Sequence, residues 1–276
     1  MSILEVKNLR KVYPSFTLDD VSFSLEEGKI TGFIGRNGAG KSTTLKSIFG
    51  FVKKDGGVVD FFDEPFEGNE AKIKQRTGFL LGEVNYYQSK KISTITRVTK
   101  SFFPSWDDAA YRAYMEKFNL DENKKPAELS AGMKVKYSLT LALSHGAELL
   151  VLDEPTSGLD PVSRDEILDI FLDLTRDGKT IFFSTHITSD LERCADNIIY
   201  IKKGRIIADE KMDALVGAYR TVTFEGEPTE LSDKLIGARH EKNGYSALIK
   251  AADAAPEMDA KEATLEDIML HMEREG

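Results

Sequence analysis

The 276-residue sequence has little cysteine, no long apolar run and no excess of positive charge. Its single cysteine, Cys194, excludes an internal disulfide and a zinc site built from cysteines. The apolar runs fall far short of the roughly 20 residues that a membrane-spanning helix needs, so we expect no transmembrane span. The first ten residues contain no apolar signal region, which favours a cytoplasmic location.

The charge balance also limits the partners. The formal net charge is −9, and no basic run stands out. An acidic chain gains nothing from the phosphate attraction that dominates nucleic-acid affinity, so we expect no nucleic-acid partner. Apolar residues make up 41% of the chain and charged residues 30%, which is typical of a folded protein rather than a disordered one.

Strand-like and helix-like segments alternate along the first 216 residues. Antiparallel strands are expected at 3–6, 23–25 and 58–62, where β-branched and aromatic residues lie in a polar setting. Near-continuous apolar runs predict buried parallel strands at 30–34, 149–152, 181–184 and 198–201. Helices are expected at 42–49, 109–118, 132–144 and 162–175. This alternation predicts a doubly wound α/β fold.

The pattern changes near residue 217, so we expect a domain at 1–216 and a small α+β appendage at 217–276. Within the appendage, strands are expected at 221–225 and 246–250 and a helix at 265–272. Thr264 and Asp267 form a weak capping box for that helix. The polar segment 251–263 is expected to be irregular.

A glycine-rich segment after the first buried strand fits the pattern G-x-x-x-x-G-K-[ST] and opens a helix. Its residues are Gly35, Arg36, Asn37, Gly38, Ala39, Gly40, Lys41, Ser42 and Thr43. Glycines let successive backbone N–H groups face one anion, and the helix N-terminus adds its positive dipole end. We therefore predict a phosphate-binding loop, in which Lys41 reaches the β- and γ-phosphates of a nucleotide and Ser42 holds Mg²⁺. The alternative is a plain glycine-rich turn with a capping serine.

Two carboxylates, Asp153 and Glu154, end the apolar run at 149–152. Ligands of open α/β sheets bind at the C-terminal ends of the strands. Asp153 is therefore expected to support Mg²⁺ through its water shell, and Glu154 to polarise an attacking water. Two solvated acids at a strand end remain the simpler alternative.

Three further short sequence motifs accompany the phosphate-binding loop and the paired carboxylates. They are Leu129-Ser130-Ala131-Gly132-Met133, Pro155-Thr156-Ser157-Gly158-Leu159-Asp160 and Ser184-Thr185-His186. Together with the phosphate loop and the paired carboxylates, they resemble the ATP-binding cassette (ABC) ATPases over about residues 1–216. The resemblance implies an ABC-type P-loop NTPase core, with an antiparallel β subdomain and a helical subdomain at about 84–145.

The resemblance also implies roles for individual residues. Tyr13 would stack on adenine, and His186 would sense the γ-phosphate. Ser130 and the helix that begins at Gly132 would face the ATP of a second cassette, and Asp160 would line the seam of that head-to-tail dimer.

The sequence departs from the family pattern at two places. Ala131 and Met133 replace the Gly and Gln of the usual L-S-G-G-Q signature, and alanine tolerates a positive φ poorly. The position where the family usually has a metal-contacting glutamine holds Gly82-Glu83. We assign Glu83 to that position, because a carboxylate can replace an amide oxygen on Mg²⁺; Gly82 is the alternative.

The helical subdomain holds several aromatic residues, some of which are expected to be exposed. In transporters of this family, this region receives a coupling helix from the membrane subunit. The chain looks most like the ATPase subunit of a bacterial ABC-2 type exporter, peripheral on the inner face of the membrane and paired with integral-membrane permease subunits. The string Leu265-Glu266-Asp267-Ile268 is a weak further match. A soluble ABC ATPase acting on ribosomes or DNA, and a nucleotide-gated regulatory partner, remain the alternatives.

Overall fold

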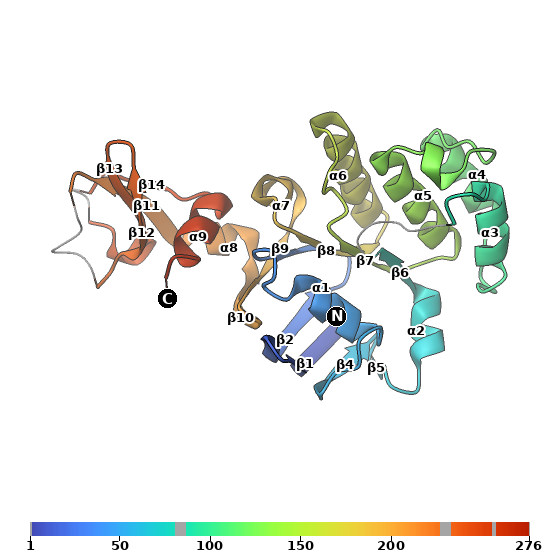
Figure 1. The fold of residues 1–276 in the computed structure, drawn as a ribbon, viewed down its shortest axis with the longest axis horizontal. Helices are drawn as coiled ribbons and strands as arrows, with labels where there is room; N and C mark the ends of the chain where they lie inside the picture. The colour runs from blue at the N-terminus through green and yellow to red at the C-terminus, as the bar shows by residue number, and fades with distance from the viewer. Residues whose placement is uncertain (1, 81–86, 227–232, 256–257, 276) are drawn as a thin grey trace.

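The computed structural model describes residues 2–80, 87–226, 233–255 and 258–275. These residues build three sheets, two of which are stacked in the main body while the third extends to one side (Figure 1). Within the described residues, none of the helices is both long and apolar enough to cross a membrane. The α/β fold that the alternating pattern predicts is confirmed.

The central sheet has six strands in the order β10-β9-β3-β8-β7-β6. The strands are β3 (Ile30–Ile34), β6 (Thr77–Leu80), β7 (Leu149–Asp153), β8 (Thr180–Thr185), β9 (Asn197–Lys202) and β10 (Arg205–Lys211). All neighbours are parallel except the edge pair β9 and β10. Every residue of β3, β7 and β8 is buried, as expected for strands covered on both faces.

The second sheet is antiparallel, with the order β2-β1-β4-β5. Its strands are β1 (Ser2–Tyr13), β2 (Phe16–Glu26), β4 (Gly56–Phe61) and β5 (Glu64–Pro65). In β2, buried Val21, Phe23 and Leu25 alternate with exposed residues, because one face packs on the core and the other meets water. The three expected antiparallel strands are confirmed.

Layers of different composition cover the two faces of the central sheet. Leu149 and Val151 of β7 belong to the apolar cluster shared with α1 (Lys41–Ile48) and the antiparallel sheet. Leu150 and Leu152 belong to the cluster shared with α5 (Ala131–Ser144), α6 (Pro161–Arg176) and α7 (Thr188–Cys194). In Figure 1, α5, α6 and α7 lie above the central sheet, while α1 and the antiparallel sheet lie below it. Alternate side chains of one strand therefore join the two halves of the core.

The segment predicted as a helical subdomain carries short helices with a small core of their own. The helices are α3 (Ile92–Lys100), α4 (Asp108–Lys117), the 3-10 turn η1 (Pro126–Glu128) and α5. Their buried residues include Ile92, Tyr111 and Tyr137. The Thr96 hydroxyl hydrogen-bonds both tyrosine hydroxyls, at 3.1 and 2.8 Å. The remaining helices of the main body are α2 (Glu70–Arg76) and α8 (Met212–Gly217).

The C-terminal sheet has the order β12-β13-β11-β14 and carries α9 (Leu265–Met272). Its strands are β11 (Tyr219–Phe224), β12 (Ile236–Glu241), β13 (Gly244–Lys250) and β14 (Ala260–Glu262). The expectation of an irregular segment at 251–263 is wrong at its two ends, which hold the 3-10 turn η2 (Ala251–Asp253) and β14, which pairs with β11. Leu265 and Ile268 join the main apolar cluster, so α9 packs onto the body of the protein. The division at residue 217 stays a prediction.

Candidate functional site

The glycine-rich loop lies between β3 and α1, and it leaves the first turn of α1 open to an anion. Gly40 is the N-cap of α1 with φ +118°, and no side chain caps that end. A Cβ on Gly40 would lie 2.6 Å from the Leu18 side chain and 2.9 Å from the Phe16 ring. The first turn has no acidic residue. The backbone N–H groups of this turn therefore lack a side-chain partner and point outward, which fits a phosphate group.

Lys41 is buried at the start of α1, with 5% of its side chain exposed. Its Nζ donates a hydrogen bond to the Gly35 carbonyl at 2.6 Å and lies 3.4 Å from Glu154 Oε1. A buried ammonium group needs partners of this kind, because leaving it unpaired in a poorly solvated place is costly. Lys41 thus brings positive charge to the floor of the loop.

Glu154 leaves β7 with φ +52°, the left-handed region that side chains other than glycine seldom adopt. Its backbone N–H donates to the Ser184 carbonyl at 3.0 Å and to Ser184 Oγ at 3.1 Å. The Ser184 hydroxyl in turn donates to Asp153, which is 5% exposed. Ser184 on β8 therefore holds the turn in a conformation that costs on the order of 1–3 kcal/mol by itself.

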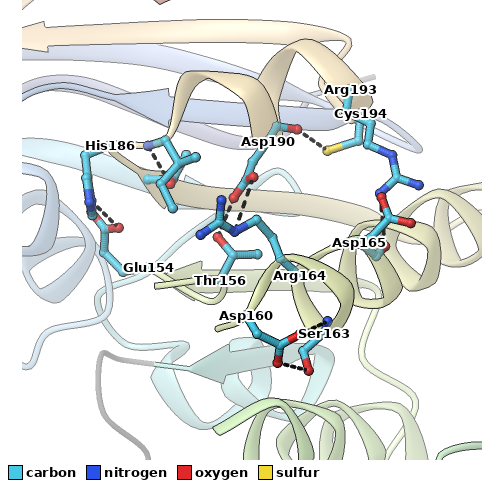
Figure 2. Close-up of polar contacts among 12 residues, drawn as sticks. Glu154, Thr156, Asp160, Ser163, Arg164, Asp165, His186, Asp190, Arg193 and Cys194 are labelled. Atoms are coloured by element: carbon cyan, nitrogen blue, oxygen red, sulfur yellow. Dashed lines mark hydrogen bonds and ion pairs between the residues drawn. The ribbon is translucent and has the colours of Figure 1, made fainter. Parts of the chain in front are cut away.

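His186, just after β8, completes a row of three charged or polar side chains. Its Nδ1 lies 2.9 Å from Glu154 Oε2, while Glu154 Oε1 faces Lys41. Figure 2 shows His186 and Glu154 facing each other. The structure thus brings together Lys41, Glu154 and His186, three residues that the sequence motifs single out from segments up to 145 positions apart (186 minus 41).

A cavity of about 590 Å³ opens over these residues. Its lining consists of Ser15, Phe16, Arg36, Asn37, Gly38, Gly40, Lys41, Ser42, Thr43, Glu154, Ser157 and His186. The volume and the open amides fit a nucleoside triphosphate, and the Ser42 hydroxyl and nearby Asp153 are oxygen donors of the kind that Mg²⁺ prefers. The aromatic residue in this lining is Phe16, whereas Tyr13 is its cross-strand partner in the β1–β2 hairpin.

Comparison with known proteins agrees with this geometry. The family described as ABC transporter matches residues 18–157. The chain is 31% identical over 218 residues to the bacitracin transport ATP-binding protein BcrA of Bacillus licheniformis, covering 78% of this chain and 71% of that protein. It is 32% identical over 265 residues to the Nod factor export ATP-binding protein I of Burkholderia orbicola (strain AU 1054), covering 92% and 87%.

The chain belongs to the ABC transporter family. Among solved structures, an ATP-binding subunit of an ABC transporter matches with a TM-score of 0.70 and 27% identity, covering 77% of this chain and 91% of that one. This protein is accordingly an ATP-binding ATPase cassette of that family.

Three residues with expected roles at the dimer seam do not line the described cavity. Ser130, Gly132 and Asp160 are not part of the described lining. Ser130 is the N-cap of α5, where its Oγ accepts a hydrogen bond from the Met133 N–H at 3.2 Å. Asp160 is the N-cap of α6, and hydrogen bonds from Ser163 lower its pKa.

The concern about Ala131 in the signature is not supported. Ala131 is the first residue of α5 and is not among the described residues with positive φ. Alanine is a good helix former, and it keeps the backbone N–H at this helix end. Met133 instead packs its side chain against the core of α3, α4 and α5.

Two other expectations concern the helical subdomain and the segment just before it. Glu83, assigned to the metal-contacting position, lies outside the described residues, as does its alternative Gly82. Exposed aromatics are present: Tyr87 is 79% and Phe102 68% exposed. Phe103 is half-buried, because its ring stacks on His145 with centroids 3.9 Å apart.

Sequence reasoning missed one buried polar group of the cassette. Asp190 on α7 is 2% exposed, and it binds the hydroxyl of Thr156 and faces Arg164 (Figure 2). Burial raises the pKa of Asp190, while Thr156 and Arg164 oppose that rise. The signal available in the sequence was its place four residues after His186, in the first turn of a short helix.

Proposed function

We propose that this cassette binds Mg-ATP in the P-loop cavity and hydrolyses it to drive export through separate membrane subunits, most like the ABC-2 type. The observation that carries the proposal is the convergence of Lys41, Glu154 and His186 at the open end of α1. Phosphoryl transfer depends mainly on positioning and electrostatic stabilisation, and these residues supply both.

Each residue has one task in the reaction. Lys41 and the N–H groups of the loop hold the β- and γ-phosphates. Glu154 orients and polarises the attacking water, and His186, held to Glu154 at 2.9 Å, contacts the γ-phosphate side of the site. Ser42, Asp153 and Glu83 would hold Mg²⁺, which would supply positive charge against the triphosphate. Adenine stacks on the aromatic hairpin that carries Tyr13 and Phe16.

The site is completed by a second cassette in a head-to-tail dimer. Ser130, Gly132 and Asp160 cannot serve the cavity of their own chain from where they lie, since they do not line it. The N-terminus of α5 carries exposed Ser130 and a positive dipole end that suits a γ-phosphate. We infer that these groups close the cavity of a partner, so that two ATP molecules lie at the seam.

The membrane partner docks on the helical subdomain, at the inner face of the membrane. Exposed Tyr87 and Phe102 support this assignment, because exposed aromatic side chains commonly mark an interface. The names of the relatives, which include an export and a transport protein, support an exporter.

A concentration series of ATPase activity and a pull-down from detergent-solubilised membranes test the two halves of this proposal. We expect the rate per molecule to rise from nanomolar to tens of micromolar protein, and the tagged protein to recover a polytopic membrane subunit. A flat rate per molecule would count against the shared site, and recovery of ribosomes in place of a membrane subunit would count against export.

A further inference from the structure

The buried carboxylate of Asp190 is not used by the mechanism above, although it is the most enclosed charged group near the cavity among the residues discussed. Its Oδ2 accepts a hydrogen bond from Thr156 Oγ1 at 2.6 Å, and its Oδ1 lies 3.8 Å from Arg164 Nε. Burying a carboxylate is energetically costly unless partners compensate. A buried carboxylate in this position is therefore expected to have a role in the arrangement of the site.

The Thr156–Asp190 contact lies close in sequence to both Glu154 and His186. Thr156 lies two residues after Glu154, in the loop that connects β7 to α6, and Asp190 lies four residues after His186, in the first turn of α7. The loop after β7 and the segment that runs from the end of β8 into α7 are thus joined twice, once by the Glu154–His186 contact at 2.9 Å and once by Thr156–Asp190 at 2.6 Å. The second contact is buried, whereas His186 is 43% exposed.

The two contacts differ in how firmly they hold the loop. An exposed contact exchanges readily with water, while a short hydrogen bond to a buried carboxylate is charge-assisted and shielded. Glu154 also has a left-handed backbone that the surrounding structure must hold in place. The Thr156–Asp190 bond is well placed to do so, and Arg164 on α6 keeps the carboxylate paired.

We propose that Asp190 is a positioning residue for hydrolysis, which acts through Thr156 to hold the Glu154 carboxylate in register with His186. This inference rests on the proposed roles of Glu154 and His186. A loosened loop lets Glu154 drift from the line of attack, and a displacement of about 1 Å can cost about a hundredfold in rate. Nucleotide binding is expected to change little, because neither Thr156 nor Asp190 belongs to the described lining of the cavity.

The test uses Thr156→Val, which keeps the volume and removes the hydroxyl, and Asp190→Asn, which removes the charge. We expect each to lower kcat about ten- to hundredfold with the ATP dissociation constant within about twofold of wild type. The conservative Thr156→Ser variant, which keeps a donor, is expected to restore most of kcat. The double variant is expected to be no slower than the worse single variant, because both act on one bond.

A matched control separates positioning from plain stability. Arg193 joins α7 to α6, as the Asp190–Arg164 pair does, through the Asp165 carbonyl at 3.1 Å and Asp169 at 2.8 Å. Figure 2 shows Arg193 at the far end of α7 from His186. Arg193→Gln is expected to lower thermal stability with kcat unchanged.

The inference is overturned if Thr156→Val lowers kcat no more than Arg193→Gln, if Thr156→Ser is as slow as Thr156→Val, or if the single effects multiply in the double variant. If Asp190→Asn fails to fold, the comparison of Thr156→Val with Thr156→Ser tests the inference. Failure of the proposed function would give a different result, because Glu154→Gln would then hydrolyse ATP at the wild-type rate.

Discussion

Replacement of Glu154 by glutamine separates ATP binding from hydrolysis. The variant keeps the shape of the side chain and removes one negative charge 3.4 Å from the Lys41 ammonium and 2.9 Å from His186 Nδ1. The backbone N–H of residue 154 keeps its hydrogen bonds to Ser184, so the turn is expected to persist. Hydrolysis is expected to fall by about 10²–10⁴, the usual contribution of a general base.

ATP affinity is expected to move in the opposite direction. We expect Glu154 to compete with the triphosphate for Lys41, because the Coulomb attraction of the two side chains at 3.4 Å is about 5 kcal/mol at an effective dielectric constant near 20. Glutamine still offers Lys41 an amide oxygen, so only the excess of a charged over a neutral hydrogen bond is lost, about 1 kcal/mol. This corresponds to an affinity for ATP about fivefold tighter. With hydrolysis stalled, a dimer is expected on gel filtration in Mg-ATP.

Single-turnover hydrolysis and equilibrium titration with a fluorescent ATP analogue measure both effects. Glu148→Gln is the control, since Glu148 immediately precedes β7 at the opposite end of the strand and pairs with Arg76 at 2.6 Å. Its hydrolysis rate and ATP affinity are expected to match wild type. Wild-type hydrolysis by Glu154→Gln would refute the catalytic assignment. A weaker affinity for ATP in that variant would refute the competition for Lys41.

Four further outcomes are expected. Lys41→Ala removes the buried cation of the loop and is expected to abolish ATP binding at micromolar nucleotide, as calorimetry can check. Ser130→Ala is expected to lower the rate at high protein concentration without changing the ATP affinity of the monomer, which a titration at nanomolar protein measures. Phe102→Glu is expected to abolish recovery with membranes while ATP binding persists, and the reverse pattern would contradict the docking surface. Thr264→Ala removes the cap of α9, where Thr264 Oγ1 accepts from the Asp267 N–H, and is expected to lower the free energy of unfolding by about 1 kcal/mol in denaturant titration.

The elements of the main body that the sequence predicts are those whose patterns are local. The buried strands appear as near-continuous apolar runs, and the glycine-rich loop directly follows one of them and opens a helix. The capping box of Thr264 and Asp267 is likewise present as expected. In each case, the residues that decide the structure are within a few positions of one another.

The contacts that set the site depend on tertiary structure. The left-handed turn at Glu154 is held by Ser184 of a neighbouring strand, and the carboxylate of Asp190 meets Thr156 from 34 positions away. Strand β14 contains only Ala260, Lys261 and Glu262, a polar sequence with no strand signal of its own, and it exists because β11 offers it an edge. Such features depend on which segments become neighbours in the fold. The local sequence pattern does not contain that information.

The signature region shows how a departure from a family pattern acquires a physical meaning. From sequence alone, alanine at position 131 is expected to be unfavourable if the backbone there has a positive φ, which glycine would tolerate. In the structure, the residue starts α5 with a helical backbone, so its N–H points out of the helix end together with that of Gly132. The exchange of glycine for alanine therefore leaves the backbone donors of this surface in place. The loss at position 133 is different in kind, because the Met133 side chain turns into the local core. We therefore expect the partner's phosphate to be bound at this surface by Ser130 and by backbone N–H groups, without a side-chain donor from position 133.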